Sequence, residues 1–228
     1  MSLNGKAAVA EDGRAATREQ LLDTAAEVFA EHGFRSATVR EICQRAGANI
    51  AAINYHFGDK ETLYTEVVRR CMRTARDKYP PTVGLSARPT REQKLRAFIH
   101  SFLLRIFDAG PNGMRGRLIL REMVDPTNAL DVAVAEEVRP IAGYLMEIIR
   151  EFLGPRAGDE QVRLCGMSVV SQVLFYNHCR PMVVRLFPEL KFDARVIEQL
   201  TDHITAFSVA GLKQANAAAS RRRKSCNA

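Results

Sequence analysis

The chain has 228 residues, a hydrophobic content of 46%, a charged content of 26% and a formal net charge of +7. These values are typical of a globular protein with room for one large domain or two small ones. No run of 18 apolar residues occurs, and the first residues lack the apolar core of a secretory signal, so the sequence predicts neither a membrane span nor a membrane partner.

The cysteines and histidines indicate no catalytic or metal site. The five cysteines are odd in number and form no C-x-x-C pair, which favours buried thiols in a reducing cytoplasm over disulfides or zinc. The five histidines are far apart, and no H-E-x-x-H, G-x-S-x-G or phosphate-loop motif occurs. We therefore expect no metal, no cofactor and no enzymatic activity.

The periodicity is helical along the whole chain and predicts an all-α fold. The first expected helix starts at a capping box, Thr17 to Gln20, and ends at Gly33. Behind the box, apolar residues recur on one helical face. They are Leu21, Leu22, Ala25, Val28 and Phe29.

Three more helices follow in the N-terminal part. A second capping box at Thr38 opens a helix that reaches about Ala46, and Asn49 can cap the next one, which reaches about His56. Asp59 can cap a longer helix towards Lys78, where two prolines end it.

Residues 79–89 form the clearest boundary, because they hold three prolines and a glycine without any period. A third capping box at Thr90 opens a long helix that a glycine-rich stretch closes near residue 110. Shorter helices are expected over 114–124 and after Thr127, where Pro140 must kink the helix or start a new segment. Two long helices complete the chain, over about 159–179 and 194–217.

These elements predict two domains. We expect a disordered start, a helix-turn-helix domain with a connecting helix to about residue 78, a larger helical domain for ligand binding and dimerisation, and a disordered basic tail. Their ranges are 1–15, 16–60, 79–218 and 219–228.

The segment GANIAAINYHFGDKETL, residues 47–63, has the pattern of a helix-turn-helix. Two short helices and a tight turn let the second helix enter the major groove of DNA while the first crosses the backbone. Gly47 suits the left-handed conformation of such a turn. Ile42, Ala46 and Ile53 are expected to face inward and lock the two helices together.

The outer face of the second helix is then free for base edges. The Asn54 amide can pair with adenine, and Ala51 and Ala52 could lie against thymine methyl groups. Arg40 could reach a guanine edge or a phosphate. The complete set of expected DNA-contacting residues is Thr38, Arg40, Asn49, Ile50, Ala51, Ala52, Asn54, Tyr55 and Lys60.

Phosphate contacts are expected from Thr38, Tyr55 and Lys60. For Lys60 the start of the adjoining helix adds a favourable dipole and free amides. The competing interpretation is an ordinary helical hairpin in which Tyr55, His56 and Phe57 are core aromatics, and spacing alone leaves both open.

The segment from Thr17 to about Cys71 resembles the DNA-binding domain of TetR-family transcriptional regulators. The matching pieces are AEVFAEHGF, SATVREICQRAGA and AINYHFGDKETLY. The resemblance implies that Tyr55 and Lys60 contact phosphates and that Arg40 and residues 50–54 lie near bases. Asn54 stands where many members carry a tyrosine, so the base preference does not transfer. The pieces LILREMVDPTNAL, EEVRP and QVLFYNHCRP resemble the CecR-type subset.

The resemblance further implies a homodimer through the last two long helices, which doubles the DNA contact. It also implies a cavity for a small-molecule effector, whose lining would suit a largely apolar compound. For each candidate lining residue, ordinary core packing is the competing explanation. The candidates are Phe98, Phe102, Phe107, Met114, Leu118, Arg121, Met167, Gln172, Tyr176 and His178.

The sequence therefore predicts a cytoplasmic, homodimeric repressor that binds double-stranded operator DNA and leaves it when an effector binds. The alternative is a ligand-independent regulator or activator without a functional effector pocket. Residues 1–80 carry nearly balanced charge, so DNA affinity must come from a few placed contacts. The basic segment 221–224 could add non-specific phosphate affinity.

Overall fold

The computed structural model describes the backbone of residues 3–107 and 111–226 and the side chains of residues 13–107 and 116–217. Within these ranges the chain is helical and contains no strand, which confirms the predicted all-α class. No helix of the described part is both long and apolar enough to cross a membrane. The helices form two compact units, unit 1 with residues 1–74 and 109–137, and unit 2 with residues 75–108 and 138–228.

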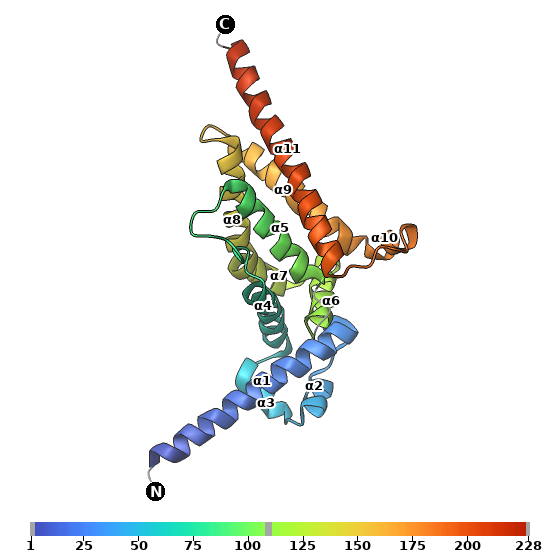
Figure 1. Cartoon of the computed structure of the whole chain (residues 1–228). Helices are drawn as coiled ribbons and strands as arrows, with labels where there is room; N and C mark the ends of the chain where they lie inside the picture. The colour runs from blue at the N-terminus through green and yellow to red at the C-terminus, as the bar shows by residue number, and fades with distance from the viewer. Residues whose placement is uncertain (1–2, 108–110, 227–228) are drawn as a thin grey trace. The chain divides into compact units, whose positions relative to one another are not determined.

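Unit 1 contains the predicted helix-turn-helix and the helices that support it (Figure 1). Its elements are α1 (Leu3–Ser36), α2 (Val39–Ala46), α3 (Ile50–Phe57), most of α4 (Lys60–Lys78), α6 (Pro111–Val124), α7 (Asn128–Ala133) and the π-helix η1 (Val134–Val138) up to Glu137. The end of α4, from Ala75 onward, belongs to unit 2. The predicted apolar face of α1, from Leu21 to Phe29, is buried in one cluster with Ile42, Ile53 and Tyr64. This cluster fixes the positions of α2 and α3 on α1.

Unit 2 is a helical bundle. Its elements are α5 (Arg91–Phe107), α8 (Arg139–Leu153), α9 (Asp159–His178), the short α10 (Arg180–Leu186) and α11 (Ala194–Cys226). Helices α5 and α11 pack along each other, and α8 packs against both α9 and α11 (Figure 1). Leu95, Ile99 and Leu103 of α5 are fully buried in the core of this bundle, as their spacing predicts.

Local capping signals explain most helix starts. The hydroxyl of Thr38 accepts a hydrogen bond from the amide of Glu41 at 3.1 Å, and Asp59 Oδ1 accepts from the Thr62 amide at 2.7 Å. At Thr90 both bonds of a capping box form: the hydroxyl accepts from the Gln93 amide, and Gln93 Oε1 accepts from the Thr90 amide. These three predicted helix starts are confirmed.

The predicted helix start at Thr17 is wrong. Helix α1 begins at Leu3, and the Thr17 hydroxyl donates back to the carbonyl of Gly13, one turn earlier in the same helix. The residues before Thr17 are mostly good helix formers, so nothing forces a boundary there. The predicted end at Gly33 is confirmed, because Gly33 adopts φ 77°, ψ 170° and interrupts the helix.

Three further features concern element boundaries. The break predicted at Pro140 is confirmed, since η1 ends at Val138 and α8 starts at Arg139 with the proline in its first turn. Helix α11 extends to Cys226, beyond the end expected near Ala217. Residues 109–137, which the sequence grouped with the larger domain, associate with the N-terminal helices.

Among the described residues, Cys43, Cys71, Cys165 and Cys179 form no disulfide, and Cys226 lies outside the described side chains. Burial raises the pKa of the Cys43 and Cys165 thiols, which keeps both protonated near neutral pH. Among the described side chains, no three His, Cys, Asp or Glu residues are arranged to hold a metal ion.

Candidate nucleic-acid interface

The turn between α2 and α3 is closed by backbone hydrogen bonds. Gly47 adopts φ 61°, ψ 27°, the left-handed conformation that the sequence predicts for it. The Gly47 amide donates to the carbonyl of Gln44, and the Ala48 amide donates to that of Cys43 at 2.9 Å. This pair of bonds satisfies the last carbonyls of α2 and directs the chain sharply into α3.

Asn49 and Thr38 both cap helices with their side-chain oxygens. Asn49 Oδ1 accepts a hydrogen bond from the amide of Ala51 at 3.1 Å, and Thr38 caps α2 in the same way. Their side chains are exposed at the starts of the two helices, where amides also point outward. Each residue thus has a structural role beside the DNA contact that the sequence predicts.

Helix α3 presents a distinct outer face. Ile53 and Phe57 point into the core of unit 1, and Ala52 is half-buried against it. His56 is half-buried, and the other positions, Ile50, Ala51, Asn54 and Tyr55, are exposed. Ile50 is 48% exposed and Tyr55 is 70% exposed, so Tyr55 is not the core aromatic of the competing interpretation. Large apolar side chains on an open helix face are typical of a contact surface.

Lys60, at the start of α4, is held in place by α1 and the residues that follow it. Its Nζ donates to the carbonyl of Arg35 at 3.4 Å and lies 4.8 Å from the centre of the Phe34 ring. Burial lowers the pKa of Lys60 below that of an ordinary lysine. The ammonium group is therefore half-buried and ordered next to the first amides of α4.

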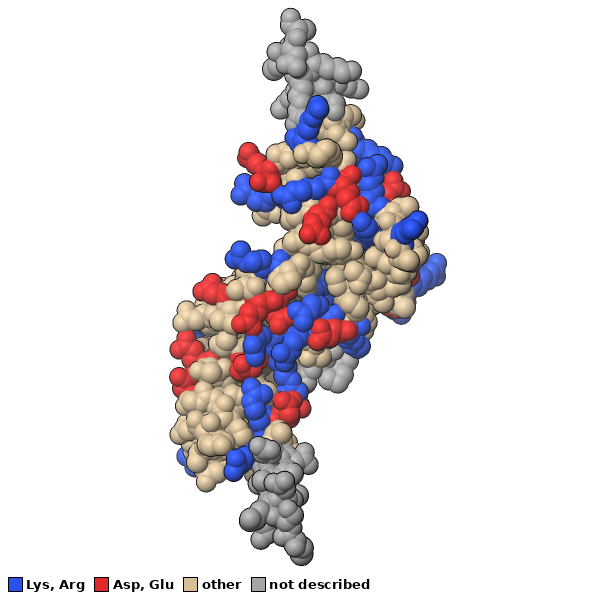
Figure 2. Space-filling view, turned by 90° about the vertical axis from the view of Figure 1, so that its left-hand side faces the viewer, with Lys and Arg blue, Asp and Glu red and all other residues tan. Residues whose placement is uncertain are grey.

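Two exposed arginines flank this position. Arg40, a predicted contact, is exposed on α2. Arg35 was not predicted; its guanidinium is 81% exposed and pairs with Asp125 at 2.9 Å. Its position three residues before the Thr38 cap could have indicated from the sequence that it lies near the start of α2. Figure 2 shows Lys and Arg interspersed with Asp and Glu on one face of the molecule, which agrees with the balanced charge of the N-terminal part.

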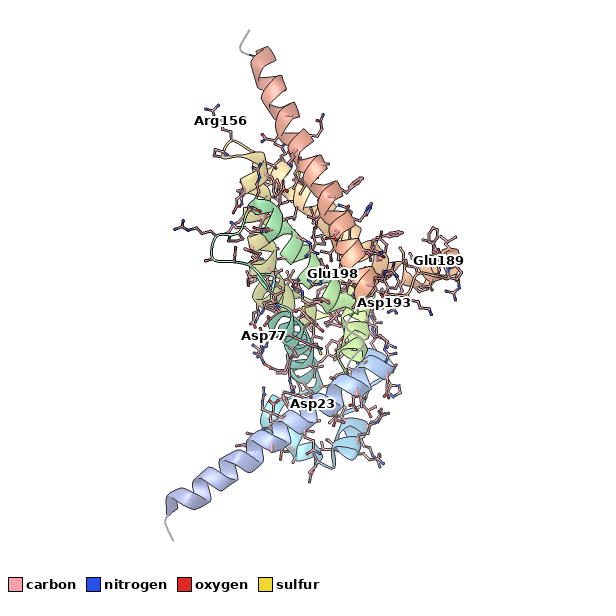
Figure 3. All side chains as sticks on the ribbon, viewed as in Figure 1. Asp23, Asp77, Arg156, Glu189, Asp193 and Glu198 are labelled. Atoms are coloured by element: carbon pink, nitrogen blue, oxygen red, sulfur yellow. The ribbon has the colours of Figure 1, made fainter. Side chains whose placement is uncertain are left out.

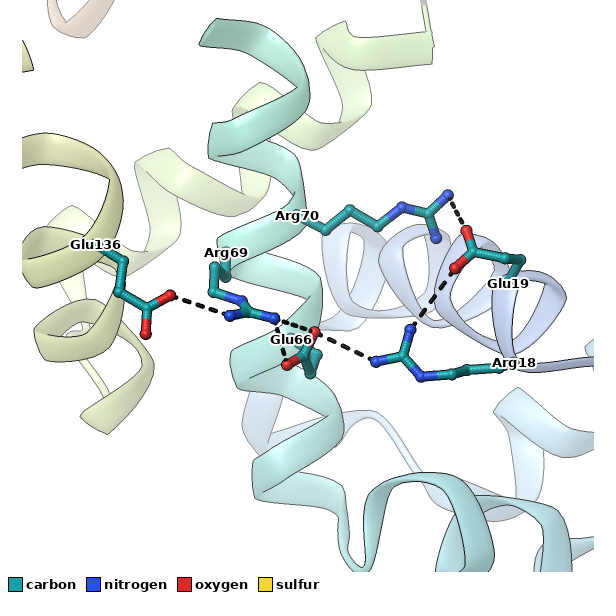
Figure 4. Close-up of polar contacts among 6 residues, drawn as sticks. All are labelled: Arg18, Glu19, Glu66, Arg69, Arg70 and Glu136. Carbon is teal, nitrogen blue, oxygen red and sulfur yellow. Dashed lines mark hydrogen bonds and ion pairs between the residues drawn. The ribbon is translucent and has the colours of Figure 1, made fainter. Parts of the chain in front are cut away.

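A network of ion pairs connects α1, α4 and η1 (Figure 4). The Glu66 carboxylate forms ion pairs with Arg69 at 2.7 Å and with Arg18 at 3.5 Å. Arg69 forms a second ion pair, with Glu136, at 3.0 Å. Arg70 pairs with Glu19 at 2.9 Å on the other side of α4. Several half-buried charges that share partners contribute more than isolated surface pairs do. The network orients α1 and α4, which carry the helix-turn-helix.

The end of α1 contacts α6 through Arg121. The Arg121 Nη2 donates to the carbonyl of Glu31 at 3.0 Å, and thereby caps the last turn of the helix. A Cβ at Gly33 would lie 2.6 Å from Arg121 Nη1, so the close approach depends on the glycine. Arg121 was predicted as a polar anchor for a ligand; in this structure it holds the end of α1.

A buried polar cluster connects α4 with the segment between α6 and α7. The Tyr64 hydroxyl donates to Glu122 Oε1 at 2.6 Å, and both the amide and the hydroxyl of Thr127 donate to the same carboxylate. Glu122 is 1% exposed and Tyr64 is 2% exposed. Burial and the contact with Glu122 raise the pKa of Tyr64.

The structure brings only some of the expected pocket residues together: Phe98, Phe102, Phe107 and Tyr176 belong to the core cluster of unit 2. Phe98 and Phe107 are buried in the core of unit 2, where Phe107 stacks on Phe192 at 4.4 Å. Leu118, by contrast, is buried in the core of unit 1. Phe102 and Tyr176 are half-buried, and Gln172 and His178 make hydrogen bonds inside unit 2. Met167 is exposed, and the side chain of Met114 lies outside the described set.

Helices α9 and α11 share an exposed apolar surface. On α9 it consists of Leu164, Met167 and Phe175, whose spacing places them along one side of the helix. On α11, Phe207 is 66% exposed and its neighbours Ala206 and Ala210 are small and exposed. Large apolar side chains exposed on two packed helices form a candidate interaction surface.

Two family models match the chain. The model described as "Bacterial regulatory proteins, tetR family" matches residues 21–67, and the model described as "HTH-type transcriptional dual regulator CecR, C-terminal domain" matches residues 91–212. The first range contains α2, α3 and the start of α4. The second covers more than half of the chain and contains α5, α8, α9, α10 and most of α11, together with α6, α7 and η1.

Known proteins resemble the chain along most of its length. The HTH-type transcriptional dual regulator CecR of Shigella flexneri is 26% identical over 196 residues, which cover 82% of this chain and 87% of that protein. The HTH-type transcriptional activator FasR of Mycolicibacterium smegmatis is 32% identical over 173 residues, 72% of this chain and 74% of that protein.

A solved structure shares the fold. The crystal structure of AibR in complex with isovaleryl coenzyme A and operator DNA matches with a TM-score of 0.60 and 18% identity. The match covers 84% of this chain and 97% of AibR.

Proposed function

The chain belongs to the TetR family of bacterial transcriptional regulators, and we propose that it acts as a homodimeric repressor that leaves its operator when a small molecule binds unit 2. The observation that carries the proposal is the outer face of α3. Ile50, Asn54 and Tyr55 are exposed on a short helix that a capped, left-handed turn sets at an angle to α2.

The proposed DNA contacts divide into two kinds. Lys60, Tyr55, Thr38 and the first amides of α3 and α4 hold phosphates and set the position of α3 on the duplex. Asn54, with Ile50 and the small alanines beside it, then meets the base edges in the major groove. Arg40 serves at the rim of the same groove. The half-burial of Lys60 supports its role, since an ordered cation loses less conformational entropy on binding than a freely moving one.

One α3 helix buries too little surface for tight binding, so the proposal requires two. A homodimer through α9 and α11 would place two copies of α3 about 34–36 Å apart, one helical turn of DNA. The exposed apolar residues of these two helices support this interface, because a second chain that covered them would remove their apolar surface from water. The two-fold rotational symmetry of such a dimer predicts an inverted repeat in the operator.

Regulation by a small molecule needs different affinity of that molecule for two states of the dimer. The crystal structure of AibR contains both isovaleryl coenzyme A and operator DNA, so a protein of this fold binds both kinds of ligand. The sign of regulation differs among relatives, since CecR is named a dual regulator and FasR an activator. Repression is the simplest consequence of a dimer that occupies a promoter.

The proposal is tested by two linked measurements. Genomic DNA fragments bound by the purified full-length protein are sequenced, and the strongest fragment is labelled for fluorescence anisotropy with a panel of small molecules. We expect an inverted repeat among the fragments and at least one compound that lowers affinity tenfold or more. Saturable binding to one fragment that no compound weakens would support the ligand-independent alternative. No preference among fragments would refute the DNA-reading role.

A further inference from the structure

Arg105 in unit 2 differs from Lys94 and Arg96, two other cations of helix α5 that have carboxylate partners, and from Arg91, which is exposed and donates to the carbonyl of Glu151. Lys94 pairs with Glu151 at 2.6 Å, and Arg96 pairs with Glu198 and Asp202 at 2.6 and 2.9 Å. His100 also contacts Glu198, at 3.0 Å. Arg105 is half-buried near the end of the helix, and among the described residues no carboxylate pairs with it.

The contacts of Arg105 leave part of its guanidinium unused. Its Nε donates to the carbonyl of Ser101 at 3.3 Å, and its Cζ lies 5.1 Å from the centre of the Phe102 ring. Within the described part of the chain, its Nη1 and Nη2 contact no acceptor. Guanidinium nitrogens arranged as a fork match the two oxygens of a carboxylate or phosphate.

A second cation lies close to Arg105. The fully buried hydroxyl of Ser101 donates to the carbonyl of Tyr79 at 2.6 Å, which brings the end of α4 next to this part of α5. Arg76 precedes Tyr79 by three residues and pairs with Asp77, which is labelled in Figure 3. The charge of Arg76 adds to the effect of burial and lowers the pKa of Arg105 to about 10.

Burial of a charge without a counter-charge is costly, and protein structures usually supply a partner from the same chain. At α5 the fold supplies such partners to Lys94 and Arg96, whereas among the described residues Arg105 has an apolar ring on one side and a like charge nearby. An anionic ligand would offset this cost directly. The neighbouring Phe102, itself packed edge-on against Phe98 at 6.2 Å, would contact the uncharged part of that ligand.

We propose that Arg105 is the anchor for the anionic group of the effector, and that the effector is an organic carboxylate or phosphate with an apolar body. This inference rests on the proposed function and revises the largely apolar compound that the sequence predicts. Arg105 binds the charged group through Nη1 and Nη2, which contact no acceptor among the described residues, and Phe102 contacts the apolar chain. The charge of Arg105, which has no carboxylate partner in the described part of the chain, provides the preference for an anion over a neutral analogue.

The test uses three eight-carbon probes on the full-length protein without DNA: octanoate, octyl phosphate and 1-octanol. Binding is measured by isothermal titration calorimetry and by the shift in Tm at millimolar concentration. We expect octanoate, octyl phosphate or both to bind at least tenfold more tightly than 1-octanol. In Arg105→Met the preference for the anion disappears, whereas the matched variant Arg96→Met keeps it.

The stability of the ligand-free variants separates anchoring from a structural role. Because no described carboxylate pairs with Arg105, Arg105→Met is expected to leave Tm unchanged or to raise it, while Arg96→Met loses two ion pairs and lowers it. A marked fall of Tm in Arg105→Met, or equal binding of octanoate and 1-octanol, would overturn the inference. So would the absence of binding by all three probes.

Binding of the selected genomic fragment by wild type and Arg105→Met is measured in parallel. Intact DNA binding together with failure of the anion test refutes only the anchor. Failure of the wild-type protein to bind any fragment refutes the proposed function itself.

Discussion

At the scale of single residues, two residues of the same type can differ in burial and therefore in role. Ile53 and Ile50 are three positions apart on α3, yet the first is fully buried and the second is half-exposed. Tyr64 is buried against Glu122, whereas Tyr55 extends into solvent. The exposed member of each pair belongs to the proposed DNA surface, and the buried member holds that surface in position.

Lys60 is predicted to bind a phosphate rather than a base. Lys60→Ala should weaken binding to all DNA sequences alike and reduce the salt dependence by about one counterion for each protomer, because one phosphate contact per protomer is lost. Fluorescence anisotropy at several salt concentrations measures both effects. The exposed Lys191 provides a control, since Lys191→Ala should change neither. An unaltered salt dependence in Lys60→Ala would contradict this role.

Lys60 also predicts a pH dependence. Burial lowers its pKa, so its charge is lost at a lower pH than that of an ordinary lysine. DNA affinity should therefore fall as the pH rises through this lowered pKa. In Lys60→Arg the guanidinium remains charged, and this part of the fall should vanish. Equal pH profiles for wild type and Lys60→Arg would argue against a charged contact by Lys60.

The Tyr64–Glu122 hydrogen bond is predicted to stabilise unit 1. Tyr64→Phe removes the donor and leaves the buried carboxylate with fewer partners, which should cost about 1–3 kcal/mol of unfolding free energy. Tyr55→Phe removes the same atom from an exposed ring and should leave the stability unchanged. Chemical denaturation of both variants measures the difference. Similar losses in the two variants would show that burial of the hydroxyl does not matter.

At the scale of elements, local signals predicted the structure well and tertiary ones did not. The caps at Thr38, Asp59 and Thr90 are correct because each acts within one turn of its own chain. The box at Thr17 fails because the same motif can occur inside a continuing helix. The sequence does not predict the hydrogen bond between Arg121 and the carbonyl of Glu31, which holds the end of α1, because the two residues are 90 positions apart.

The candidate sites follow the same division. The outer face of α3 could be derived from helical periodicity, which is a local property, and its exposed residues match the derivation. The pocket residues depend on which helices meet, and the sequence grouped Leu118 with the wrong core. Arg105 was not predicted from the sequence, because the lack of a carboxylate partner among the described residues can be recognised only from the three-dimensional structure.

The turn between α2 and α3 gives a prediction at this scale. Gly47→Ala should cost about 1–2 kcal/mol, because the left-handed conformation is unfavourable for a residue with a Cβ, although the space around it is open. Gly143→Ala, in the middle of α8 with equally open space, should stabilise by about 0.5–1 kcal/mol. Thermal unfolding distinguishes the two. Stabilisation by both substitutions would mean that the turn is not strained by a side chain.

At the scale of the whole molecule, dimerisation links the two units to one function. The proposed interface uses exposed apolar residues of α9 and α11, and the DNA surface uses those of α3. Neither surface is explained by packing within one chain. Operator recognition through an inverted repeat requires both, since the second half-site supplies the contacts that a single α3 lacks.

Phe207 tests the interface. Phe207→Glu should convert the dimer to a monomer in sedimentation-velocity experiments and weaken operator binding at least a hundredfold, while the folded monomer keeps its helical content because the side chain is exposed. Val124, which is 85% exposed in unit 1, is the matched control, and Val124→Glu should remain dimeric. A wild-type monomer, or a Phe207→Glu dimer, would exclude this interface.

The most direct test of the account is a parallel selection from a pool of randomised duplex DNA with the wild-type protein and with Asn54→Ala. We predict that wild type enriches an inverted repeat, and that Asn54→Ala enriches the same repeat with the preference lost at one symmetric pair of positions, since a bidentate contact to a base contributes about 1–3 kcal/mol of discrimination. An identical motif in both selections, or no motif with the wild-type protein, would contradict base reading by the outer face of α3.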